Sequence, residues 1–447
     1  MKSQEMGDPT AFHWAVGNLF DDRMFAGDKQ HGNTKWPIKT LVWMALVWVW
    51  GSERGLRQRF QRGLSILEKW SPLKPLTYQG FIKTLRNRSG HLVPMLCQSL
   101  RERILSLSQD RKRYAGYIPI AVDGTRVGAP RTKANEQWCA RDSGHRARRR
   151  RSSRSRPSAH RQPIQPPGPQ IWLTVLWHMN WGVLWDWRQG PNGSNERVHL
   201  REMFDSLPAK TLLVADAGFQ GYEYWSELLQ RGHSFLIRVA GQVRLLKELG
   251  CIRRPSNIVY LWPEKSRRRH QPPLVLRLIE LHNGRRPVCL VTNVLTELTA
   301  CQMLDIYRQR WGVEIFFRTF KQTYGRSKLL SHAPQNVELE LNWSLLGLWC
   351  VEFWNAQALH ERGEPPQHHS AAGALRVLRD CLELTAHGIN SPLTGLASLS
   401  RDGYERKQRC IRTWPQKKPQ DAIKGPQIRP ANPQEREAAK QFMSQPA

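Results

Sequence analysis

The segment Tyr307–Lys321, YRQRWGVEIFFRTFK, decides how the rest of this chain is interpreted. On an α-helix, at about 100° per residue, four of its polar residues fall within an arc of roughly 60°. These four are Tyr307, Arg310, Glu314 and Lys321, and Arg318 lies beside them. Apolar residues gather on the other side, where a core would lie: Val313, Phe316 and Phe320. A carboxylate among cations suits a metal ion next to phosphate. An exposed helix face with ion pairs at helical spacing is the alternative.

The charge of the chain indicates a polyanionic partner. Its 447 residues include 68 Lys and Arg against 37 Asp and Glu, a net charge of +31. Such an excess most often means nucleic acid, with a ribosome-like or membrane-surface protein as the alternative. The eight Cys include no C-x2-C pair, which indicates neither a zinc site nor a disulfide framework and fits a reducing cytoplasm. No signal peptide is recognisable, and the apolar block 38–50 is too short to span a bilayer.

Composition and pattern divide the chain into five parts. Residues 1–112 are predicted to form a helical N-terminal domain whose basic faces suit DNA binding, although a solvated helical cap explains them equally well. Residues 113–240 are predicted to form the first part of a catalytic core, interrupted by a disordered basic loop over 139–169. A β-rich insertion subdomain is expected over 241–292, and the second part of the core over 293–400. Residues 401–447, rich in Lys, Pro and Gln, predict a mobile basic tail.

Three acids stand where strands or a helix of this core would present them. Asp123 is placed at the far end of the apolar run 117–127, YIPIAVDGTRV, and Asp216 ends the run TLLVA. Glu314 lies on the later helix. The order of elements favours a mixed sheet flanked by helices, and ligands of such sheets gather at the carboxyl ends of strands. Three carboxylates without His or Cys suit two Mg²⁺ or Mn²⁺ ions, which catalyse in-line displacement at phosphorus, while Arg310 and Lys321 would hold the phosphates.

The spacing Tyr307-x2-Arg310-x3-Glu314-x6-Lys321 resembles the Y-R-E-K signature of DDE transposases of bacterial insertion sequences, the insertion sequence four family. Asp123-Gly124-Thr125 is similar to the first-Asp motif of that family and Asp216-Ala217-Gly218-Phe219 to its second. The Ser194-x-Glu196-Arg197 element and the β-rich insertion also match.

The resemblance implies a ribonuclease-H-like α/β core and a homodimer on paired double-stranded element ends. It also implies cut-and-paste movement of DNA in the bacterial cytoplasm, in association with the nucleoid. By similarity, Asp123, Asp216 and Glu314 are the catalytic metal ligands. The residues that would contact DNA are Tyr307, Arg310, Lys321 and Arg318.

Two departures leave the activity of this copy open. Ala217 stands where the family often has Arg, and the basic interruption is longer than the family leads one to expect. An aromatic of the insertion receives a flipped base in relatives, and Trp262 is available for this role, although among 19 Trp a core position explains it better.

The favoured function is therefore a metal-dependent DNA transposase. The alternatives are a ribonuclease-H-like nuclease without strand transfer and a catalytically inactive DNA-binding remnant. No Ser/His/Asp triad or Gly-rich phosphate loop is recognisable, which disfavours a small-ester hydrolase or an NTPase.

Overall fold

The computed structural model describes most of the chain, namely residues 19–20, 22–25, 36–69, 76–108, 113–140, 168–250, 257–282, 287–387 and 425–442. The predicted disordered loop falls mostly on residues 141–167, which lie outside these ranges. Its near edge is helical, since α5 covers Lys133–Cys139. Among the described helices, none is both long and apolar enough to cross a membrane.

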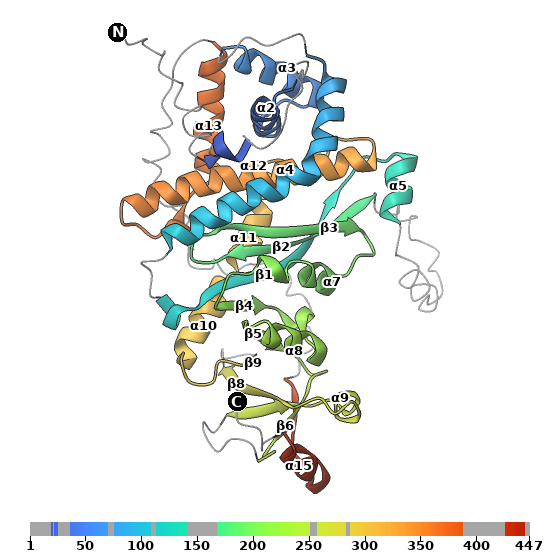
Figure 1. Ribbon diagram of the computed structural model, residues 1–447, viewed down its shortest axis with the longest axis vertical. Helices are drawn as coiled ribbons and strands as arrows, with labels where there is room; N and C mark the ends of the chain where they lie inside the picture. The colour runs from blue at the N-terminus through green and yellow to red at the C-terminus, as the bar shows by residue number, and fades with distance from the viewer. Residues whose placement is uncertain are drawn as a thin grey trace, which may run out of the picture.

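One sheet runs through the molecule. Its ten strands follow the order β10-β6-β7-β8-β9-β5-β4-β1-β2-β3. The strands of its first half are β1 (Ile118–Gly128), β2 (Gln170–His178), β3 (Val183–Pro191), β4 (Thr211–Ala215) and β5 (Ser234–Val239). β1, β2 and β3 pair antiparallel, whereas β4 and β5 run parallel to β1. This mixed order, with helices on the sheet, is the predicted ribonuclease-H-like α/β architecture (Figure 1).

The β-rich residues after β5 extend the same sheet. They form β6 (Arg244–Lys247), β7 (Ile258–Leu261), β8 (Leu274–His282) and β9 (Pro287–Thr292). β9 returns to pair antiparallel with β5, so that this part of the chain is joined to the core by backbone hydrogen bonds. Short helices α8 (Tyr222–Gln230) and α9 (Glu264–Arg268) lie beside these strands (Figure 1).

Asp123 lies within β1, not at its end as predicted. β1 pairs with β2 through Gly128, because residues beyond Asp123 continue the alternating contact with the hairpin partner. On its other side, β1 pairs with β4 only as far as Ala121 opposite Val214. Asp123 and Asp216 therefore both lie two residues beyond the last β1–β4 pair, where no strand pairing joins them.

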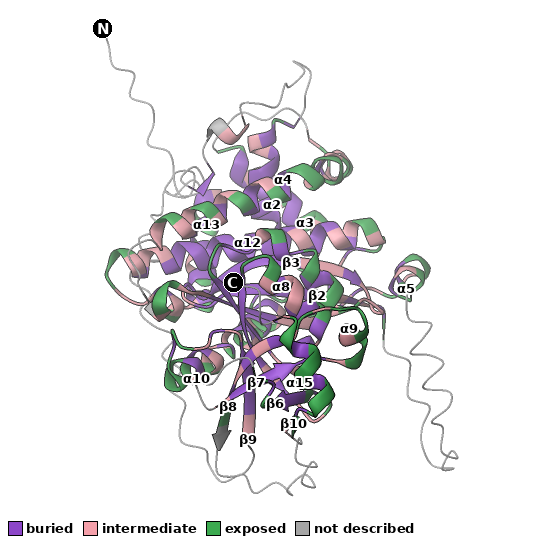
Figure 2. Ribbon diagram, turned by 60° about the horizontal axis from the view of Figure 1, so that its bottom comes forward, coloured by how far each residue is buried: buried purple, intermediate pink, exposed green. Residues whose placement is uncertain are grey.

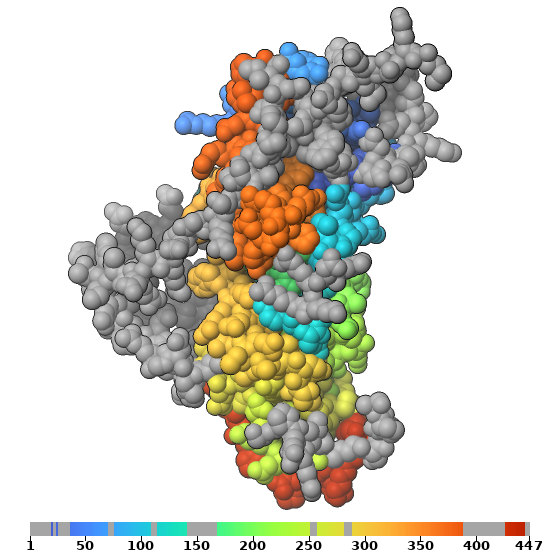
Figure 3. All heavy atoms as spheres, turned by 90° about the vertical axis from the view of Figure 1, so that its left-hand side faces the viewer, coloured from blue at the N-terminus to red at the C-terminus, as the bar shows by residue number. Residues whose placement is uncertain are grey.

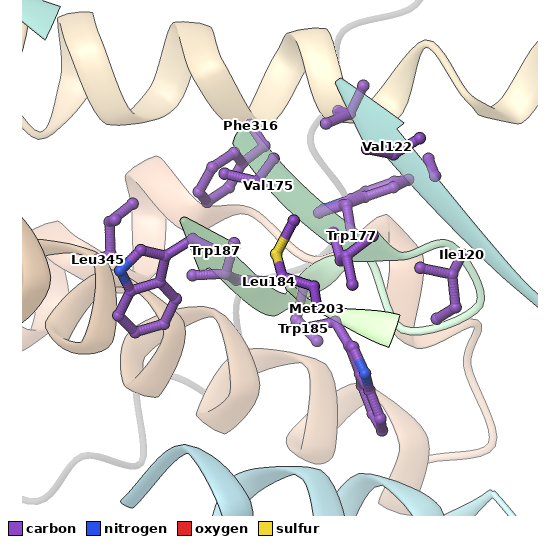
Figure 4. Packing of buried hydrophobic residues seen from close by; sticks show 14 of the residues in the cluster. Ile120, Val122, Val175, Trp177, Leu184, Trp185, Trp187, Met203, Phe316 and Leu345 are labelled. Carbon is purple, nitrogen blue, oxygen red and sulfur yellow. The ribbon is translucent and has the colours of Figure 1, made fainter. Parts of the chain in front are cut away.

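The described residues before β1 are mainly helical. The helices are α2 (Ile38–Trp50), α3 (Leu56–Leu67) and α4 (Tyr78–Leu107). Nearly all of α2 is buried, because α3, α4 and two later helices surround it (Figure 2). These later helices are α12 (Pro334–Glu361) and α13 (Ala371–Ala386). Figure 4 shows Leu345 of α12 beside Trp187 of β3, so that α12 joins the helical layer to the sheet.

The sequence pattern predicts one continuous helix from about Leu298 to Tyr324 that stops at Gly325, but in the structure this helix is broken twice. α10 (Ala300–Gln309) and α11 (Gly312–Arg318) are separated at residues 310–311, where i→i+3 hydrogen bonds tighten the backbone, such as Glu314 N to Trp311 O. A π-turn, η5 (Thr319–Thr323), follows α11, and Gly325 ends the helix with φ 72°. The prediction of an uninterrupted helix was therefore wrong, although the predicted stop at Gly325 is confirmed.

The prediction of a mobile tail is wrong for residues 425–442. β10 (Gln427–Pro430) pairs parallel with β6, and α15 (Pro433–Lys440) follows it. The buried Glu435 accepts hydrogen bonds from Arg267 at 2.8 Å and from Arg429 at 2.6 Å. The pair with Arg267 joins this segment to a distant part of the chain, and the pair with Arg429 links β10 to α15.

Candidate active site

Three parts of the chain bring the predicted carboxylates together. Asp123 projects from β1, Asp216 follows β4 as the N-cap of a short 3-10 turn, and Glu314 stands on α11. The side chains of Asp123 and Asp216 each accept a hydrogen bond from the next backbone N–H, at 2.8 and 2.7 Å. These bonds fix the two carboxylates at the point where the strands diverge.

Arg310 lies among these carboxylates. Its guanidinium is 3.1 Å from Glu314 Oε1 and 3.8 Å from Asp123 Oδ2, and its side chain is only 11% exposed. Burial alone would lower its pKa, but the combined charges of Tyr307, Asp123, Asp216 and Glu314 raise it. The guanidinium thus contacts Asp123 and Glu314 directly, and the charge of Asp216 acts on it as well.

The pKa values of the site reflect burial first and neighbouring negative charge second. Burial raises the pKa of Asp123, the Gly124 N–H and Arg310 oppose this shift, and Glu314 and Asp216 add to it. Burial, followed by the charge of Asp216, also raises the pKa of Tyr307. A buried carboxyl that repels two others is poised to accept a cation.

The remaining signature residues border the same space. The Lys321 Nζ atom lies on the π-turn and donates to Thr125 Oγ1 of β1 at 2.5 Å, and burial lowers the pKa of this ammonium. The Arg310 guanidinium lies 5.7 Å from the centre of the Tyr307 ring. Arg318 is on the exposed side of α11, away from the core residues of that helix. Figure 3 shows the segment around α10 and α11 (yellow) as one continuous face of the molecule.

A close backbone approach holds α11 against the sheet. A Cβ atom added to Gly312 would lie 2.0 Å from Trp177 Cη2 of β2. Figure 4 shows Trp177 in the packed layer, with Phe316 of α11 beside Val175. Gly312 is two residues before Glu314. This contact therefore helps to set the distance between the Glu314 carboxylate and β1.

The structure adds two residues that sequence reasoning missed. The guanidinium of Arg238, on β5, lies 3.9 Å from Asp216 Oδ1. The only sequence signal for this residue is that it is a charged residue within an otherwise apolar strand. Trp311, between Arg310 and Gly312, is 61% exposed. Its position on the polar face of the predicted helix is the sequence signal for this exposure. Trp262, in contrast, is buried and donates to the Gln271 carbonyl at 2.8 Å, which supports its core interpretation.

The donor set fits hard divalent cations. Asp123, Asp216 and Glu314 supply oxygen ligands alone, and their mutual repulsion is incompletely balanced by Arg310 and Arg238. Within the described ranges, no three His, Cys, Asp or Glu side chains are already arranged as a metal site. The Arg310 guanidinium lies between Asp123 and Glu314 in this arrangement.

Residues 187–350 match the family described as the transposase DDE domain. The chain carries a transposase DDE domain. The matched range includes Asp216 and all of Tyr307–Lys321, and it starts after β1. The predicted family is thereby confirmed, while the Y-R-E-K subgroup stays a prediction.

Two known proteins illustrate the similarity. Transposase InsG for insertion sequence element IS4, from Escherichia coli (strain K12), is 24% identical over 190 residues, which are 40% of this chain and 42% of InsG. The similarity thus spans less than half the length of that relative. The piggyBac transposase in its synaptic complex with hairpin DNA aligns over 88% of this chain and 85% of its own, with 11% identity and a TM-score of 0.40.

Proposed function

We propose that this protein is a metal-dependent DNA transposase that cleaves the ends of an insertion sequence and joins them to target DNA. The observation that carries the proposal is that Arg310 pairs with Asp123 of β1 and Glu314 of α11, while the charge of Asp216, at the end of β4, also acts on it. These carboxylates belong to distant parts of the sequence, and a purely structural role does not explain why the fold gathers them around one cation.

Asp123, Asp216 and Glu314 would hold two Mg²⁺ or Mn²⁺ ions. When bound, such ions activate a water or a 3′-hydroxyl and stabilise the leaving oxygen at phosphorus. Arg310 balances the carboxylates beforehand, and once displaced it remains close enough to bind a phosphate oxygen. Lys321, held by Thr125, and Arg238, beside Asp216, would bind phosphates on either side of the carboxylates.

Tyr307 and Arg318 would complete the contacts to the DNA backbone. The Tyr307 ring of α10 lies against Arg310, and the exposed Arg318 stands on the outer side of the next helix, α11. The net charge of +31 would attract duplex DNA from either an element end or a target. Cut-and-paste movement needs two ends processed together, and we therefore propose that a homodimer is the active form.

The test uses a labelled duplex taken from the DNA that flanks this gene, where the proposed function places an inverted repeat. The Glu314→Gln variant removes one carboxylate of the triad while keeping the shape of the side chain. We expect it to lose cleavage in Mg²⁺ and to keep binding of the duplex in Ca²⁺. Glu361→Gln changes an exposed carboxylate at the end of α12 and serves as the matched control.

The products distinguish the proposal from its alternatives. Cleavage by Glu314→Gln at the rate of the unchanged protein would remove Glu314 from the site. Cleaved but never joined DNA, in an assay with a plasmid target, would favour a nuclease without strand transfer. Binding with a steep salt dependence, and no metal-dependent cleavage by the unchanged protein, would favour an inactive DNA-binding remnant.

A further inference from the structure

The separation of Asp123 and Asp216 needs an explanation that strand pairing does not supply. Asp123 belongs to the antiparallel ribbon of β1, β2 and β3, where it lies opposite Val175. Asp216 follows β4, which is paired on its other side with β5 through Ala215. Because β1 and β4 stop pairing at Ala121 and Val214, the two carboxylates stand on opposite sides of an unpaired gap.

The helix α7 (Glu196–Arg201) lies against β1, β2 and β3. It follows β3 directly and therefore belongs to the ribbon that carries Asp123. Its first residue, Glu196, lies against β1: a Cβ atom added to Gly124 would lie 2.4 Å from Glu196 Oε1 and 2.9 Å from Cδ. The other oxygen of the same carboxylate lies 3.7 Å from the Cβ position of Gly218, two residues after Asp216.

The second residue of α7 makes the bond that crosses the gap. Arg197 Nε donates to the Gly218 carbonyl at 2.8 Å. The backbone N–H of Arg197 in turn donates to the Asn195 side chain at 2.9 Å. Asn195 thereby caps the N-terminus of α7 and holds the Arg197 backbone in place. Glu196 and Arg197 thus connect the first Asp motif to the second.

The clamp acts from behind the carboxylates. Successive side chains of a strand point to opposite faces, so that the Cβ position of Gly124 points away from the face on which Asp123 meets Arg310. Glu196 therefore supports β1 from the face opposite the proposed metal ligands. A larger residue at position 124 would displace the Glu196 carboxylate.

We propose that Glu196 and Arg197 form a positioning clamp that fixes the separation of Asp123 and Asp216 and so sets the metal affinity of the site. This inference rests on the proposed function. Groups that orient metal ligands typically contribute about 10–100-fold to metal affinity. The clamp residues act through the two Asp residues and need not touch either the metal or the DNA.

The experiment measures the thermal stabilisation of the full chain by Mn²⁺ alone, since an ion that binds only the folded state raises its melting temperature. Arg197→Gln removes the bond across the gap, and we expect it to raise the Mn²⁺ concentration at half-effect by about 10–100-fold. Arg201→Gln is the control. Arg201 is an exposed arginine on the same helix, and its Nε atom lies 2.9 Å from Glu227 of α8, away from the gap.

A second variant pair tests the packing itself. Gly124→Ala should weaken Mn²⁺ binding in the unchanged protein because its Cβ displaces Glu196. In a Glu196→Ala background, which already lacks the clamp carboxylate, it should add no further loss. Additive losses would show that Gly124 acts independently of Glu196 and would overturn the clamp.

The outcomes separate the two proposals. Equal Mn²⁺ responses of Arg197→Gln and Arg201→Gln, whether both unchanged or both weakened, would overturn the clamp while the unchanged protein still binds the ion. A lack of any Mn²⁺ response in the unchanged protein would count against the proposed metal chemistry, and the clamp would fall with it.

Discussion

The contact between Gly312 and Trp177 makes a sharp prediction for Gly312→Ala. The added methyl would lie 2.0 Å from Trp177 Cη2, whereas an ordinary contact begins at 3.4 Å, so that α11 and β2 must separate by about 1.4 Å. Trp177 is buried and has little room to retreat. The displacement is therefore passed to the helix that carries Glu314.

Stability and function should respond differently to this change. Overpacking of this kind costs about 1–3 kcal/mol, and replacing Gly by Ala within a helix returns roughly 1 kcal/mol. The free energy of unfolding should therefore fall by no more than about 2 kcal/mol. A misplacement of about 1 Å can cost about 100-fold in rate. Single-turnover cleavage of the end duplex should fall by at least about that factor, because Glu314 moves away from Asp123 and Asp216.

Two further variants establish the cause. Gly90→Ala changes a glycine within α4 whose added Cβ meets no atom within 4 Å, and it should stabilise the protein by about 0.5–1 kcal/mol without affecting cleavage. Trp177→Phe removes the outer ring atoms that the methyl meets and should restore part of the cleavage lost in Gly312→Ala. Cleavage by Gly312→Ala within a few-fold of the unchanged protein, or no restoration by Trp177→Phe, would refute the reasoning.

Two other changes test the charges of the structure. Asp123 has a raised pKa in the folded protein, so its ionisation destabilises the fold: the penalty is absent below the unfolded pKa of about 4 and complete above the folded pKa. In EDTA, Asp123→Asn should therefore melt higher than the unchanged protein at pH 7, and this gap should close as the pH falls towards 4; a constant gap would contradict the prediction. Glu435→Ala leaves Arg267 and Arg429 without their shared partner and should destabilise the packing of residues 427–440 by about 1–3 kcal/mol. Hydrogen exchange should show lost protection over β10 and α15 with little change in β1, whereas unchanged protection there would show that the ion pairs are dispensable.

Patterns within short segments predicted most of the elements. The apolar run Ser234–Val239 predicts a strand and the pattern over Ala371–Ala386 predicts a helix, and β5 and α13 have these same limits. Hydrophobic alternation and capping act over a few residues, and these signals are complete within each segment. The three carboxylates stay predicted ligands, and they are recognisable in the sequence because each follows or interrupts an apolar run.

Features that depend on distant partners escaped the sequence. The Lys, Pro and Gln content of residues 401–447 predicts a mobile tail. The Arg267 guanidinium, far away in the sequence, pairs with the buried Glu435 carboxylate and helps to hold part of this segment in place. Arg238 could be recognised as a polar residue in β5, although only the pairing of β4 with β5 places it beside Asp216. The break at residues 310–311 could not be predicted from the spacing of residues, because a rotation of about 100° per residue holds only for one regular helix.

The position of the candidate site explains why its supports are long-range. The carboxylates stand where β1 and β4 diverge, so that regular backbone pairing cannot hold them at a set distance. The protein instead uses side chains from other elements. Arg197 crosses the gap behind the strands, Arg310 connects Asp123 to Glu314 in front, and Gly312 admits Trp177 so that α11 can lie close to β2. Where β1 and β4 diverge, they lose the backbone hydrogen bonds that would hold their separation. Side chains from distant parts of the sequence must then hold that separation instead.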